Sequence, residues 1–211
     1  MYHYLLKYFA LITVTALFYT PVLSQDHAEK AEDVTPLLIS SVIPDVELKD
    51  IDGNTVNLRN TVSQKPTILI FYRGGWCPYC SRHLSELQQI EDELYDIGYQ
   101  IIAISPDRPE KLKTTLQKVE LDYTLMSDSP MTATKAFGLA FKVDQETVDR
   151  YKTMGLDLEG DSGYDHHLLP APAVYILNTE GIVKFNYVNP DYKERINGEV
   201  LLTAAEAYFE E

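Results

Sequence analysis

The two cysteines of the chain, Cys77 and Cys80, lie three positions apart where the hydrophobic pattern changes. Before them, residues 66–72 (PTILIFY) form a continuous apolar run of strand length, which is typical of a strand buried on both faces. After them, from Pro78, apolar residues recur every three or four positions, which predicts an amphipathic helix. A buried strand that leads directly into such a helix favours a fold in which helices cover a sheet.

Strand and helix patterns continue to alternate along the rest of the chain. Hairpins are predicted at 46–58 and 171–188, strands at 99–105 and 123–128, and helices at 78–97, 107–120, 130–138 and 197–211. We expect Gly98 to end the first helix and Asp107 to cap the second. Alternating strands and helices predict an α/β sheet with both faces covered, and the late hairpin makes that sheet mixed.

The stretch 139–169 has the weakest pattern. Residues 140–152 (AFKVDQETVDRYK) have the spacing of an amphipathic helix. Residues 155–167 (GLDLEGDSGYDHH) are rich in glycine and aspartate, which indicates a loop. We therefore expect a helix followed by a surface loop before the second hairpin.

The N-terminal residues 1–24 have the composition of a signal peptide. They contain one cation, Lys7, an apolar run at 8–19, and Val22 and Ser24 at the −3 and −1 positions of a plausible cut before Gln25. The apolar run is too short for a comfortable membrane span. We predict export to the periplasm or outside the cell, with membrane contact only through this segment. An uncleaved anchor or a buried helix is the alternative.

Composition and charge limit the class of protein and the partners that the chain can have. The 211 residues are 45% hydrophobic and 24% charged, which suits one globular domain. The polar residues 25–36 are interpreted as a linker or frayed helix, and residues 37–211 as the domain. The formal net charge of −14 repels phosphate backbones, so no nucleic-acid partner is expected.

Three functions are open to the cysteine pair: a structural cross-link, a metal site or a redox centre. A cross-link over this spacing closes the smallest loop and stabilises least. A structural zinc site needs four ligands, which His83, His166 or His167 would have to complete. Adjacent loop histidines are more often exposed than metal ligands, so we predict no metal and no cofactor.

The redox interpretation is favoured because C-x-x-C lies at a strand-to-helix junction. Proline is preferred at the first helical position, so Cys77 precedes the helix, where free amides and the helix dipole stabilise a thiolate. Cys80 lies one turn later, at a separation compatible with a disulfide.

Aromatic and basic side chains flank the pair. Trp76 and Tyr79 can form a rim that faces the substrate or simply pack. Arg73 and Arg82 can stabilise a thiolate or a bound peroxide, or lie on the surface as solvated side chains.

Four segments give the chain a family resemblance: IPDVELKDIDGNTVNL, FYRGGWCPYCSRHLSEL, YTLMSDSPMTATKAFGL and LPAPAVYILNTEGIVKFNYVNPDY. From about residue 37 to 202, the chain resembles peroxiredoxins of the alkyl hydroperoxide reductase and thiol-specific antioxidant family, in a branch with C-x-x-C. The resemblance implies a thioredoxin-like fold, with a mixed central sheet flanked by helices and an N-terminal hairpin extension. It also implies a cis-proline that faces the cysteines, which matches Pro172, with Pro170 as the alternative.

The resemblance leaves two assignments for the attacking sulfur. The usual peroxiredoxin motif, Pro-x-x-x-Thr-x-x-Cys, places its cysteine at Cys80, its threonine at Cys77 and its proline at Arg73. A thioredoxin alignment makes Cys77 the nucleophile, and the helix start favours the same choice. The family's arginine just before the strand AVYILN is replaced by Pro172 or its neighbours.

Two functional hypotheses follow. In the first, the Cys77/Cys80 pair of a thiol-dependent peroxidase reduces hydroperoxides, and an external thioredoxin-like dithiol protein recycles it. In the second, the same pair serves a thioredoxin-like thiol–disulfide oxidoreductase that acts on protein disulfides in the cell envelope.

Overall fold

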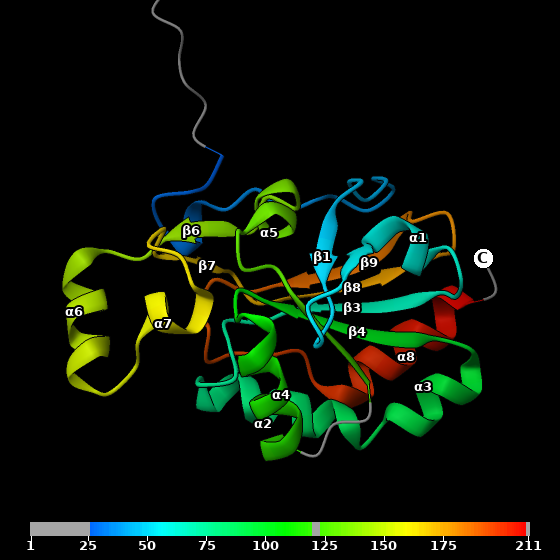
Figure 1. Ribbon diagram of the computed structural model, residues 1–211. Coiled ribbons are helices and arrows are strands. Elements are labelled where there is room, and N and C mark those ends of the chain that lie inside the picture. Colours follow the sequence, from blue (N-terminus) through cyan, green and yellow to red (C-terminus); the bar gives the residue numbers. More distant parts are fainter. Residues whose placement is uncertain (1–25, 120–122, 210–211) are drawn as a thin grey trace, which may run out of the picture.

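The computed structural model describes residues 26–119 and 123–209, which form a seven-stranded mixed sheet covered by helices (Figure 1). The strands are β1 (Glu47–Lys49), β2 (Thr55–Asn57), β3 (Thr67–Phe71), β4 (Gln100–Ser105), β5 (Thr124–Ser127), β8 (Ala173–Leu177) and β9 (Val183–Val188). Their order is β2-β1-β5-β4-β3-β8-β9. Strands β3, β4 and β5 are parallel, whereas β1 and β8 run antiparallel to their neighbours in this core. The predicted mixed sheet and both hairpins are confirmed.

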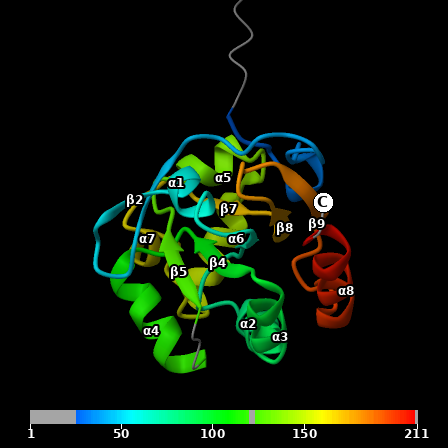
Figure 2. The ribbon, with the colours of Figure 1, turned by 90° about the vertical axis from the view of Figure 1, so that its right-hand side faces the viewer.

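Helices lie on both faces of this sheet. The helices of the described residues are η1 (Ala31–Asp33), α1 (Leu58–Val62), α2 (Pro78–Gln88), α3 (Glu91–Ile97), α4 (Pro109–Val119), α5 (Thr132–Ala136), α6 (Gln145–Thr153), α7 (Leu158–Ser162) and α8 (Gly198–Phe209). Helices α2, α3, α4 and α8 cover one face, and α1 and α5 cover the other (Figures 1 and 2).

Strand β3 shows why both faces must be covered, because all five of its residues are buried. Ile68 and Ile70 pack into the cluster that includes the cysteines, while Leu69 and Phe71 pack into the cluster on the opposite face. Burying one such side chain stabilises the fold by about 1.5–3 kcal/mol. The sequence-predicted buried strand is therefore confirmed, and it ends directly before the cysteine pair.

The helix predicted over 78–97 is divided into two. Helix α2 ends at Gln88 and α3 begins at Glu91, because Ile90 leaves the helical conformation with φ −111° and ψ 11°. The break allows α3 to pack against α8. Gly98 ends α3 in the left-handed conformation with φ 117°, as predicted.

Asp107 does not cap the second helix, so that prediction is wrong. Helix α4 begins at Pro109, and the carbonyl of Arg108 accepts the amide hydrogens of Lys111 and Leu112. The side chain of Asp107 is buried, and its Oδ2 accepts the amide hydrogen of Gly75 in the loop that precedes Cys77.

Residues 139–170 form an excursion from the main sheet, and the predicted helix at 140–152 is only partly correct. The first residues form β6 (Ala140–Lys142), which pairs with β7 (Leu168–Pro170), and α6 follows with Asp144 as its N-cap. The predicted loop contains the short helix α7. The excursion projects at one end of the sheet (Figure 1).

The N-terminal segment that was interpreted as a linker lies along β6. The amide of Ala28 donates to Ala140 O and the amide of Lys142 donates to Ala28 O, each at 2.8 Å. The predicted signal peptide, residues 1–24, lies outside the described residues. Within the two described ranges, every helix is too short or too polar to cross a bilayer.

Candidate active site

Cys77 occupies the position predicted for it, at the start of α2. It is the N-cap residue with extended backbone, and Pro78 is the first residue of the helix. The carbonyl of Cys77 accepts the amide hydrogens of Cys80 and Ser81 at 3.1 and 3.0 Å. Both cysteines are free thiols, and each is about 1% exposed. The strand-to-helix junction therefore presents two adjacent, protected sulfurs.

The surroundings of Cys77 favour its thiolate. The thiol of Cys80 donates a hydrogen bond to the Cys77 sulfur, and this is the main reason that the pKa of Cys77 falls to about 6. Burial opposes the shift, while the charges of Arg73 and Arg195 add to it. Cys77 is therefore largely ionised at neutral pH.

The surroundings of Cys80 have the opposite effect. Burial raises the pKa of Cys80 well above its usual value, and the hydrogen bond and charge of Cys77 raise it further. Arg195 acts against both, because its positive charge favours the Cys80 thiolate. The pair thus combines one thiolate with one thiol, as expected when two interacting acids share a site.

Arg73, predicted either to stabilise the site or to lie on the surface, is buried with an exposed fraction of 4%. Its guanidinium carbon lies 4.0 Å from the ring centroid of Tyr192 and 5.2 Å from that of Trp76. Nη2 donates to the hydroxyl of Tyr151 at 2.7 Å. Arg73 is therefore a fixed cation beside Cys77.

Arg82 is arranged differently from Arg73. Its side chain is exposed on α2, with the guanidinium carbon 5.9 Å from the ring centroid of Tyr79. This placement agrees with a solvated surface residue.

The flanking aromatic residues contact other parts of the chain. Trp76 packs against Tyr151 with ring centroids 5.7 Å apart. Tyr79 meets Tyr192 edge to face at 5.6 Å. Both are partly exposed, so they combine the packing and rim positions that the sequence left open.

Arg195 was not found from the sequence. Its Nη2 lies 3.6 Å from the Cys80 sulfur, although the two residues are 115 positions apart. It belongs to the segment between β9 and α8, where no periodic pattern indicates a contact with α2. The missing arginine before β8 was the available signal, since it left the sulfurs without the family's usual cation.

The loop between β3 and α2 is held by Asp107. The backbone amide of Gly75 donates to Asp107 Oδ2 at 2.7 Å. Burial raises the pKa of this carboxyl to about 7. A Cβ atom on Gly75 would collide with Thr115 Oγ1, so the loop packs tightly against α4 and fixes the approach to Cys77.

The predicted cis-proline is wrong. In the part of the chain that the structure describes, every peptide bond is trans, including those before Pro170 and Pro172. Between β7 and β8, the Ala171 amide donates to Leu139 O, and the Asn189 amide donates to Pro172 O. Pro172 still lines a pocket of about 850 Å³ together with Arg73.

The three histidines considered as zinc ligands make separate contacts. His83 is buried, and burial lowers its pKa to about 4. His166 bonds Ser129 O and His167 bonds Glu159. Over residues 26–119 and 123–209, no group of three or more His, Cys, Asp or Glu residues is arranged to hold a metal ion.

Comparison with known sequences identifies relatives of this chain. The model of the AhpC/TSA family matches residues 39–186. Peroxiredoxin Bcp of Escherichia coli K12 is 33% identical over 106 residues, which cover 50% of this chain and 67% of the relative. The chloroplastic peroxiredoxin Q of Triticum aestivum is 29% identical over 161 residues, covering 76% of this chain and 64% of the relative.

Solved structures share the fold at lower identity. Reduced Prx3 of Vibrio vulnificus in complex with H2O2 superposes with a TM-score of 0.65 at 20% identity, covering 81% of this chain and 99% of that one. Peroxidoxin BcpB of Mycobacterium tuberculosis gives 0.64 at 19%, covering 81% and 97%. The fold is thus the thioredoxin-like fold of peroxiredoxins, as predicted. The chain belongs to the AhpC/TSA family of peroxiredoxins and is similar to its Bcp and peroxiredoxin Q members.

Proposed function

We propose that this thiol peroxidase reduces hydroperoxides with Cys77 as the attacking thiolate and Cys80 as the resolving thiol. Family membership supplies the reaction class: a hydroperoxide substrate and a thiol reductant. The observation that supports the division of roles is the opposite perturbation of the two sulfurs, with the pKa of Cys77 lowered and that of Cys80 raised. The thiolate is the nucleophilic form of cysteine.

The proposed chemistry has two steps within the protein. The Cys77 thiolate attacks the terminal peroxide oxygen, so that an S–O bond forms, the O–O bond breaks, and the alkoxide leaves with a proton as an alcohol. Cys80 then attacks the Cys77 sulfur of the sulfenic acid. An S–S bond forms, the S–O bond breaks, and hydroxide takes up a proton and leaves as water.

A dithiol protein of the thioredoxin type is proposed as the reductant. It would attack the Cys77–Cys80 disulfide through a mixed disulfide and restore both thiols. Tyr79 and Tyr192 partly cover the start of α2, so the reductant would approach past these rings.

Peroxide consumption with a thioredoxin-coupled assay tests the proposal, with Cys77→Ser and Cys80→Ser as matched variants. Cys77→Ser is expected to lower turnover by about 10³-fold or more, because the nucleophile is lost. Cys80→Ser is expected to form one sulfenic acid per chain on Cys77, detected by dimedone labelling and mass spectrometry, and then to stop. A sulfenic acid on Cys80 of the Cys77→Ser variant, with none on Cys77 of the other, would reverse the roles.

The thiol–disulfide oxidoreductase remains the alternative, supported by the C-x-x-C pair and by Trp76 beside it. The expected cis-proline does not support this alternative, because the peptide bond before Pro172 is trans. Reduction of insulin disulfides by the reduced protein, without peroxide turnover, would favour it.

Export is proposed from the signal-like residues 1–24 alone. N-terminal sequencing of the protein from its natural host is expected to begin at Gln25. An intact Met1 would contradict cleavage.

A further inference from the structure

Arg195 gives Cys80 a charged partner that the sequence did not predict. Its Nη2 atom lies 3.6 Å from the Cys80 sulfur, within the range for a hydrogen bond to sulfur, and Nη1 donates to Glu194 O at 2.8 Å. The side chain is partly buried. A guanidinium keeps its charge at any physiological pH, so a permanent cation touches the resolving sulfur.

The segment between β9 and α8 fixes Arg195 from both sides. On the N-terminal side, the carboxylate of Asp191 accepts the Lys193 amide at 3.0 Å, and the ring of Tyr192 covers Arg73. On the C-terminal side, Ile196 is buried in the core with an exposed fraction of 4%. The position of Arg195 therefore follows from contacts on both flanks and not from its own side chain alone.

The resolving step requires a group of this kind. Cys80 must be a thiolate to attack the oxidised Cys77, yet its burial opposes ionisation. His83, three residues further along α2, cannot supply a positive charge at neutral pH, because burial and the Arg195 charge keep it neutral. The Arg195 guanidinium and the backbone amide of Arg73 are the groups that favour the Cys80 thiolate.

We propose that Arg195 activates Cys80 for the resolving step, by stabilising the thiolate that attacks the Cys77 sulfenic acid. This inference rests on the proposed function. In that step the S–S bond forms, the S–O bond of the sulfenic acid breaks, and hydroxide leaves as water. Arg195 remains charged throughout, and Arg73 serves the first step beside Cys77.

The test separates the two steps in one experiment. Trp76 is the only tryptophan and adjoins Cys77, so stopped-flow fluorescence can follow oxidation and disulfide formation, with quenched samples assigned by dimedone labelling and mass spectrometry. In Arg195→Met, disulfide formation is expected to slow about tenfold, the effect of about one pKa unit on the thiolate fraction. The first oxidation is expected to stay within about threefold of wild type.

Two further variants control the experiment. Lys193→Met removes the same charge from an exposed side chain of the same segment, and both phases are expected to stay at wild-type rates. Arg195→Lys keeps the charge and is expected to restore most of the disulfide rate. If Arg195→Met does not fold, Arg195→Gln takes its place with the same expected slowing.

Two results would overturn the inference. One is disulfide formation within about twofold of wild type in a folded, uncharged Arg195 variant. The other is equal slowing of both phases, which would assign Arg195 to Cys77. Failure of the proposed function is a separate result, because the wild-type protein itself would then form no sulfenic acid on Cys77.

Discussion

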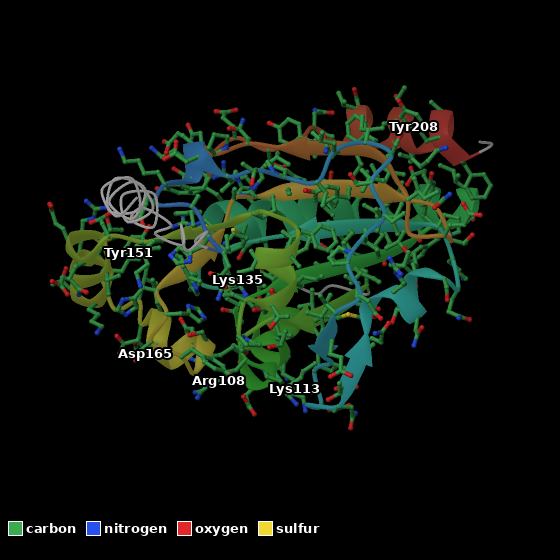
Figure 3. All side chains as sticks on the ribbon, turned by 90° about the horizontal axis from the view of Figure 1, so that it is seen from above. Arg108, Lys113, Lys135, Tyr151, Asp165 and Tyr208 are labelled. Carbon is green, nitrogen blue, oxygen red and sulfur yellow. The ribbon has the colours of Figure 1, made fainter. Side chains whose placement is uncertain are left out.

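The loop from Tyr72 to Cys77 and the excursion at residues 139–170 contribute to one site in different ways. The loop places Cys77 by local means: β3 ends, Pro78 starts α2, and the sulfur lies at the first turn. The excursion contributes over a long sequence distance, because Tyr151 of α6 bonds Arg73, 78 residues earlier. Figure 3 shows Tyr151 at one end of the molecule and Tyr208 of α8 at the other.

The groups that make Cys77 reactive differ from the groups that hold its neighbours in place. The main cause of the lowered Cys77 pKa is its neighbour Cys80, one turn away. The excursion instead holds Arg73 and packs against Trp76. Reactivity should therefore depend mainly on the loop and α2, and only secondarily on the excursion.

The largest expected effect concerns the Cys77 thiolate itself. With a pKa of about 6, Cys77 has a thiolate fraction at pH 7 about thirtyfold larger than that of a thiol of ordinary pKa. It should therefore react faster with iodoacetamide than a thiol of equal access, by less than this factor because a less basic thiolate is a weaker nucleophile. The pH profile of alkylation, read by peptide mass spectrometry, is expected to have its midpoint near pH 6. In Cys80→Ala the midpoint should rise, because the main hydrogen bond is lost. An unchanged midpoint would show that activation does not come from within α2.

The next effect concerns packing of the loop. Gly75→Ala should lower the free energy of unfolding by about 1–3 kcal/mol, because the new Cβ collides with Thr115. Urea denaturation measures the change. Thr115→Ala in the same chain is expected to restore part of it, whereas an additive loss would contradict the proposed collision.

A substitution at Tyr151 tests how much the excursion contributes to stability and to the reactivity of Cys77. Tyr151→Phe removes the hydrogen bond to Arg73. It should lower the free energy of unfolding, measured by urea denaturation, by about 1–3 kcal/mol, because a buried charged donor loses its partner. The midpoint of Cys77 alkylation should shift less than in Cys80→Ala. A larger shift in Tyr151→Phe would give the excursion the leading role.

A pH dependence of stability is expected at Asp107. Its pKa is about 7 in the folded protein and about 4 when unfolded, so the folded state binds the proton more tightly. The contribution of Asp107 to stability therefore falls as pH rises from about 4 to about 7. Asp107→Asn keeps an acceptor oxygen for Gly75 without the buried charge. In denaturant titrations, the difference in unfolding free energy between this variant and wild type should favour the variant more at pH 8 than at pH 5. The opposite trend would contradict the assignment.

Much of the fold was predictable because its signals are local. The all-apolar run of β3, the hairpin at 171–188 and the stop at Gly98 each depend on a few consecutive residues. The division between α2 and α3 was not predictable, because the apolar spacing continues through Ile90. Asp107 was misassigned for a similar reason: a carboxylate before a helix resembles a cap, and its true partner, Gly75, is distant in sequence.

The family, the class of sheet and the place of Cys77 at the strand-to-helix junction could all be predicted from the sequence, since they follow from motifs and from a local change of hydrophobic pattern. Only the tertiary structure showed that Arg73 is buried beneath aromatic rings and that Arg195 touches Cys80. It also showed that the Pro172 bond is trans. The physical reason is range: a helix start polarises a sulfur through adjacent amides, whereas charges and rings reach it from segments that only folding brings together.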